Sequence, residues 1–101
     1  MILEKLKLIF TEDEIARITV DIEPECPNVT VEVHGLKCRD AKRLINNIIN
    51  LLRVRFQLKV IHGYNHGTAI KNMLTTDFIN SHVRRKYLDS FNQGVTYMVV
   101  A

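Results

Sequence analysis

Two short segments of the chain place histidine beside glycine at the point where a predicted strand ends. The first is Val-Glu-Val-His-Gly at residues 31–35, and the second is His-Gly-Tyr-Asn-His-Gly at residues 62–67. Histidine exchanges protons near neutral pH, and a nearby carboxylate can orient the ring or bind a cation. We therefore treat Glu32, His34 and His62 as candidate catalytic residues for acid–base chemistry.

The second segment also has the features of a loop that binds an anion. Its glycines allow the backbone to approach a ligand closely, and the N-terminus of the helix predicted to follow favours a phosphate. A tyrosine ring offers a surface for base stacking, and a second histidine can donate to phosphate. The segment is too short for a Walker loop. The predicted phosphate-binding residues are Gly63, Tyr64, Asn65, His66 and Gly67.

Each of these side chains also has a plain structural explanation, and the sequence leaves both explanations open. His34 can hold the turn after its strand, and Glu32 can simply face solvent. His62 is in phase with the apolar residues of its strand and can turn inward. His66 suits the region of a helix N-cap, and Tyr64 can be an ordinary loop aromatic.

The elements that would position these residues follow from the periodicity of apolar residues. In chain order we expect a strand at 29–33, a helix at 39–53, a strand at 56–61, a helix at 67–80, and a hairpin of strands at 86–91 and 95–100. This order predicts an α/β two-layer sandwich, a β-α-β-α-β-β mixed sheet with two helices on one face, because crossover connections are right-handed. If the first two strands are parallel, both His-Gly pairs lie at one edge of the sheet.

The N-terminal part of the chain is set off by two prolines within residues 24–27, which interrupt regular structure. We expect an N-terminal extension, residues 1–27, and a domain, residues 28–101. The extension has alternating apolar residues on either side of residues 11–14, which predicts a β-hairpin. Thr11 and Glu14 also fit a capping box that opens a short helix, and the sequence does not decide between the two.

The composition permits a polyanionic partner. The 14 lysines and arginines outnumber the 11 aspartates and glutamates, the net charge is +3, and the pI is about 9.0, which is a mild basic bias. No apolar run reaches the length of about 18 residues expected of a membrane span, and no secretory signal is recognisable. Cys26 and Cys38 lack the close pairing of a zinc finger and suit reduced thiols. We expect a single-domain cytoplasmic protein.

The body of the chain resembles the Smr (small MutS-related) domain over residues 28–101. That family carries a motif of the type Leu-Asp-Leu-His-Gly, which corresponds to residues 31–35, and a loop of the type His-Gly-x-Gly-x-Gly, which corresponds to residues 62–67. The resemblance implies a fold similar to the C-terminal domain of bacterial translation initiation factor three. It also implies binding to DNA or RNA and, as in several members, endonuclease activity that nicks or cleaves a phosphodiester bond.

The hypothesis of cleavage assigns roles to individual residues. Glu32 and His34 would hold a divalent ion, Mg²⁺ or Mn²⁺, that orients water, and a metal-free mechanism with paired histidines is the alternative. Lys71 is the nearest match to the basic residue that follows the family's loop. Lys37 and Arg39 are the other basic residues near the two segments that could contact phosphates.

Two departures from the family pattern favour other functions. Glu32 replaces the usual aspartate, which moves the carboxylate outward by about one methylene, and Asn65 replaces the loop's middle glycine. A non-catalytic DNA- or RNA-binding module is therefore an alternative. A further alternative is an interaction protein whose N-terminal extension forms a homodimer through exposed strand edges.

Overall fold

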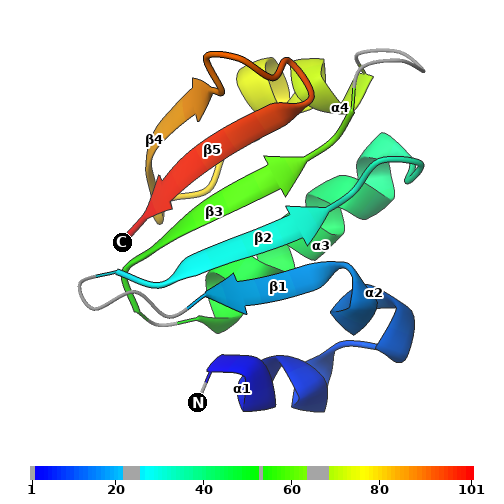
Figure 1. Ribbon diagram of the computed structural model, residues 1–101, viewed down its shortest axis with the longest axis vertical. Helices are drawn as coiled ribbons and strands as arrows, with labels where there is room; N and C mark the ends of the chain where they lie inside the picture. The colour runs from blue at the N-terminus through cyan, green and yellow to red at the C-terminus, as the bar shows by residue number, and fades with distance from the viewer. Residues whose placement is uncertain (1, 22–25, 53, 64–68) are drawn as a thin grey trace.

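The computed structural model describes residues 2–21, 26–52, 54–63 and 69–101, with side chains from residue 6 onward. Its centre is a five-stranded sheet in the order β1-β2-β3-β5-β4 (Figure 1). The strands are β1 (Ile18–Asp21), β2 (Asn28–Glu32), β3 (Phe56–Ile61), β4 (Val83–Leu88) and β5 (Val95–Val100). β2 and β3 are parallel and the other neighbours are antiparallel. The predicted mixed sheet is confirmed.

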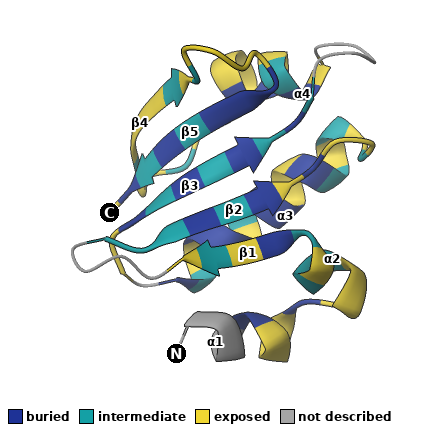
Figure 2. Cartoon of the chain, viewed as in Figure 1, coloured by how far each residue is buried: buried dark blue, intermediate teal, exposed yellow. Residues whose placement is uncertain are grey.

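One face of the sheet is covered by α3 (Cys38–Leu51) and by α4 (Ala69–Asn72), which continues as the π-helical turn η1 (Met73–Asp77) (Figure 1). Buried and less buried residues alternate along β2 and β3, so that every second side chain of these two central strands enters the core (Figure 2). The core layer of α3 is Ala41, Leu44, Ile45, Ile48 and Ile49. The two-layer α/β sandwich predicted from the periodicity is therefore the observed architecture.

The predicted N-terminal hairpin is wrong in its first half. Residues 2–9 form the helix α1 (Ile2–Ile9), and only the second half forms a strand, β1, which pairs with β2 instead. Leu6 and Phe10 are four residues apart, so a helical conformation places both on one face, and both are buried in the common core. That burial outweighs the alternation of period two that favoured a strand.

The capping box, the alternative for this segment, is confirmed. The Thr11 backbone N–H donates to Glu14 Oε1 at 2.9 Å, and the Glu14 backbone N–H donates to Thr11 Oγ1 at 3.2 Å. This pair opens the short helix α2 (Glu12–Ala16), which leads directly into β1. The N-terminal segment thus adds a strand to the sheet and apolar residues to the same core as the rest of the chain.

The other boundaries differ from the predicted ones at the C-terminal hairpin and the second helix. β4 begins at Val83 and ends at Leu88, whereas a strand over 86–91 was predicted. It ends there because Asp89 Oδ1 accepts the backbone N–H groups of Phe91 and Asn92, which turns the chain. The second helix leaves helical geometry at Phe78, so its predicted extension to residue 80 is also wrong.

Candidate active site at the ends of two parallel strands

The parallel register of β2 and β3 brings the two His-Gly segments together. Glu32 lies opposite Ile61, so the residues after each strand leave the sheet at the same edge. A Cβ atom placed on Gly63 would lie 3.5 Å from His34 Cβ, which shows how closely the two exits approach. The convergence that the sequence predicted on the condition of parallel strands follows from this register.

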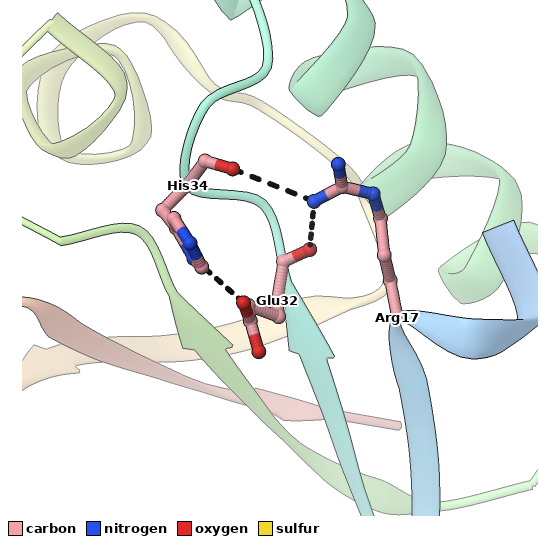
Figure 3. A network of polar contacts seen from close by, with 3 residues as sticks. All are labelled: Arg17, Glu32 and His34. Atoms are coloured by element: carbon pink, nitrogen blue, oxygen red, sulfur yellow. Dashed lines mark hydrogen bonds and ion pairs between the residues drawn. The ribbon is translucent and has the colours of Figure 1, made fainter. Parts of the chain in front are cut away.

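Glu32 and His34 form a direct polar pair at this edge (Figure 3). His34 Nδ1 lies 2.8 Å from Glu32 Oε1, with 58% of the histidine side chain and 48% of the glutamate side chain exposed. A pair this exposed contributes at most about 1 kcal/mol to stability. Its geometry is nevertheless well defined, because the carboxylate accepts the Nδ1 proton and leaves Nε2 to act on a ligand.

Arg17 holds the backbone on which this pair is mounted. Its Nη1 donates to the carbonyl oxygen of Glu32 at 3.0 Å and to that of His34 at 3.4 Å (Figure 3). The backbone N–H of Glu32 in turn donates to the Arg17 carbonyl at 2.9 Å. Sequence reasoning missed Arg17. A basic residue directly before the strand at 18–21 was its only trace, and the contact depends on the pairing of β1 with β2.

A cleft of about 710 Å³ opens beside the pair, between α2 and α3. Its lining includes the cations Arg17 and Arg43 and more numerous acidic residues, Asp13, Glu14, Glu32 and Asp40. Arg43 is also engaged by Asp40 at 3.8 Å. The excess of acidic side chains disfavours a polyanion in this cleft.

His62 is placed differently from His34. Only 5% of it is exposed, and both ring nitrogens are engaged: Nδ1 lies 2.8 Å from the Gly63 carbonyl oxygen and Nε2 lies 2.8 Å from Thr96 Oγ1. A carbonyl can only accept, so Nδ1 carries the proton and Nε2 accepts from the threonine hydroxyl. This geometry favours the structural interpretation of His62. Thr96 was not singled out from sequence, although a threonine in an apolar strand was a trace of it.

The pKa of His62 is lowered from its ordinary value, mainly because burial disfavours the charged ring, with a smaller contribution from the positive charge of Lys71. The bond to the Gly63 carbonyl opposes this effect. A neutral ring is therefore the form the fold selects. Through its hydrogen bond with Thr96, the neutral ring joins the end of β3 to β5.

The loop between β4 and β5 closes the same edge. The backbone N–H groups of His62 and Gly63 both donate to the Gly94 carbonyl, at 2.8 and 3.1 Å. Gly63 has φ of +73°, which favours glycine. A Cβ atom on Gly94 would lie 3.0 Å from Gly63 Cα, so the close approach of the two backbones requires glycine there.

The predicted binding residues fall into two groups. Tyr64, Asn65, His66 and Gly67 lie outside the described residues. Lys37 and Arg39 are exposed at the start of α3. Lys71 lies on α4 and is near enough to His62 to affect its pKa. These three cations flank the converging strand ends, each beside one of the two segments.

The metal hypothesis has limited support from the donor atoms. Within residues 2–21, 26–52, 54–63 and 69–101, no group of three or more His, Cys, Asp or Glu side chains could hold a metal ion. Glu32 and His34 are two donors already bonded to each other. Two donors alone do not complete the coordination shell of a divalent ion.

No protein-family model matches the chain, and no curated protein sequence matches it. In the part of the chain that the structure describes, no helix is both long enough and apolar enough to cross a lipid bilayer.

Proposed function

We propose that the chain is a nucleic-acid-binding protein of the Smr type that nicks or cleaves phosphodiester bonds of DNA or RNA. The observation that carries the proposal is the 2.8 Å contact between Glu32 Oε1 and His34 Nδ1 at the shared end of two parallel strands. Ligand sites in sheets with parallel strands form at this edge. The resemblance of residues 31–35 and 62–67 to the Smr motifs supports the same location.

In the proposed reaction, Glu32 holds the His34 ring and stabilises the charge that the ring acquires. His34 Nε2 takes the proton of the attacking oxygen, which belongs to water or, in RNA, to the 2′-hydroxyl. The oxygen bonds to phosphorus, the bond to the leaving oxygen breaks, and the leaving oxygen takes a proton from solvent. Lys37 and Arg39 would offset the negative charge of the phosphate. The loop at residues 63–67 would seat it.

A non-catalytic binding module is the second candidate, and His62 favours it. The mechanism with paired histidines needs a second exchangeable ring, whereas both nitrogens of His62 are engaged and the ring is buried. Only His34 is then placed to move a proton among the described histidines at this edge. A single base gives weaker catalysis than a base and an acid acting together.

The deciding experiment is a cleavage assay on supercoiled plasmid and labelled RNA, with Mg²⁺, with Mn²⁺ and with EDTA. Wild type is compared with His34→Ala, Glu32→Gln and the control His82→Ala, an exposed histidine before β4 at the opposite end of the sheet. We expect His34→Ala to slow cleavage by about 10²–10⁴-fold, the usual contribution of a general base. The control should keep wild-type activity.

The other outcomes are equally informative. Cleavage that survives His34→Ala would contradict this active site. Salt-sensitive binding without cleavage by wild type would favour the binding module. The folding of the variants is a small concern, because the exposed Glu32–His34 pair contributes at most about 1 kcal/mol.

A further inference from the structure

The face of the sheet opposite α3 and α4 carries a continuous row of polar and aromatic side chains. In register across the five strands, Thr19 lies opposite Thr30, Thr30 opposite Lys59, Lys59 opposite Tyr97, and Tyr97 opposite Tyr87. All are on the side of their strands away from the buried residues. No described helix covers this face (Figure 1).

The end of this row is a stack of rings and a cation. The ring centroids of Tyr87 and Tyr97 are 5.2 Å apart with an interplanar angle of 20°. The guanidinium of Arg85 lies 5.0 Å from the centroid of the Tyr87 ring. Both tyrosines are partly exposed and Arg85 is exposed. Proteins that bind single-stranded nucleic acids combine aromatic rings with cations. Every base has a flat face that can stack on a ring, and every phosphate has a charge that a cation can contact.

Charged side chains of both signs lie on this patch. Lys59 and Arg85 are its cations. Its carboxylate, Asp89, is engaged with the backbone N–H groups of residues 91 and 92 and with the Tyr97 hydroxyl at 3.1 Å. The carboxylate therefore serves the turn and fixes the Tyr97 ring, and its charge also interacts with that of Lys59. Both cations lie on the open face, where they can contact phosphates.

The row is continuous with the candidate active site. Glu32 is two residues beyond Thr30 on β2 and points to the same open face. Two residues along a strand correspond to about 7 Å and neighbouring strands lie about 4.8 Å apart, so Lys59 and Glu32 are about 8–9 Å apart on the sheet, within reach of neighbouring phosphates of a single strand. A chain that crosses the row at Lys59 can thus place its next phosphate beside Glu32 and His34.

We propose that this open face binds single-stranded RNA or DNA, with a base stacked on Tyr97 and Tyr87 and the phosphates along Lys59 and Arg85, and directs it to the Glu32–His34 pair. The inference rests on the proposed function and adds the strandedness of the ligand. A duplex hides the faces of its bases, so only a single strand can stack a base on the two tyrosine rings.

The test measures binding of fluorescent 12-nucleotide single strands of uridine and of thymidine, and of a 12-base-pair duplex, to the full chain by anisotropy. The variants are Tyr87→Thr, Tyr87→Phe and Lys59→Gln. Lys42→Gln on the exposed face of α3 is the matched charge control. Threonine keeps strand propensity while it removes the ring, and phenylalanine keeps the ring. Circular dichroism confirms that each variant is folded.

We expect wild type to bind single strands more tightly than the duplex. Tyr87→Thr should weaken single-strand binding about tenfold, as loss of a stacking ring does, and Tyr87→Phe should bind like wild type. Lys59→Gln should weaken binding and reduce its salt dependence, while Lys42→Gln should do neither.

Two results would overturn the inference, and they can be told apart. If wild type binds or cleaves nucleic acid but Tyr87→Thr and Lys59→Gln do not change the affinity, the open face does not bind the single strand and the proposed function still stands. If wild type binds neither strand type at low salt, this inference and the proposed function fail together.

Discussion

The contact between His62 and Thr96 gives the sharpest prediction for stability. We propose Thr96→Val, which keeps the shape of the side chain and removes the hydroxyl that donates to His62 Nε2 at 2.8 Å. Thr96 is 3% exposed and His62 is 5% exposed, so water does not replace the lost partner. The companion variants are His62→Leu and the double mutant.

The expected magnitude follows from the burial of the orphaned nitrogen. An unsatisfied buried acceptor costs about 1–3 kcal/mol, so Thr96→Val should lower the free energy of unfolding by that amount. In the His62→Leu background the same substitution should cost almost nothing, because leucine has no acceptor nitrogen that would lose its partner. The coupling energy of the cycle should therefore be about 1 kcal/mol or more.

The pH dependence of wild type has a definite sign. The folded-state pKa of His62 is lowered from 6.5, chiefly by burial. Above pH 6.5 the ring is neutral in both the folded and unfolded states, and the stability that the buried His62 ring contributes is fully present. As the pH falls below about 6.5, the unfolded state takes up the proton first, so stability is lost as the pH approaches the folded-state pKa. His62→Leu should remove this part of the acid sensitivity.

Urea denaturation at pH 7.5 and pH 5.5 measures all four proteins. A loss of about 2 kcal/mol lowers the midpoint by roughly 1 M for a chain of this size. A coupling energy near zero, or a loss of stability between pH 7.5 and pH 5.5 that is the same in wild type and in His62→Leu, would refute the placement of His62 as a buried neutral ring. It would also reopen its role as a proton carrier in cleavage.

The remaining predictions concern a turn and a helix cap, and both are measured by urea denaturation. Gly94→Ala should lower the free energy of unfolding by about 1–3 kcal/mol through overpacking, because its Cβ would lie 3.0 Å from Gly63 Cα. Gly35→Ala, with φ of +84° but open space around it, should cost about 1–2 kcal/mol through backbone strain alone. Equal stability of Gly94→Ala and wild type would contradict the close approach of the two backbones. Thr11→Ala should cost about 0.5–2 kcal/mol through loss of the capping box with Glu14, and Thr11→Ser should cost much less; no difference between the two would mean that the box is not formed.

Much of the fold was predictable because its elements are marked by local patterns. The predicted bounds of the strands at 56–61 and 95–100 agree with those of β3 and β5. The periodic apolar residues of α3 gave its buried face. The segment at 2–9 failed because its pattern fits two periods. The choice between them depends on whether Leu6 and Phe10 reach the core, which is a property of the whole fold.

The sequence by itself determined the residue types of the candidate site and the strands and helices that carry them, since these depend on neighbours a few residues away. Only the tertiary structure decided what each histidine can do. Both follow a strand and precede a glycine, yet His34 stands in solvent beside Glu32 and His62 is buried against Thr96. The row from Thr30 through Lys59 to Tyr97 likewise arises from a strand order that differs from the chain order. Pairing between strands far apart in the chain is set by the burial of the common core, so no local pattern contains it.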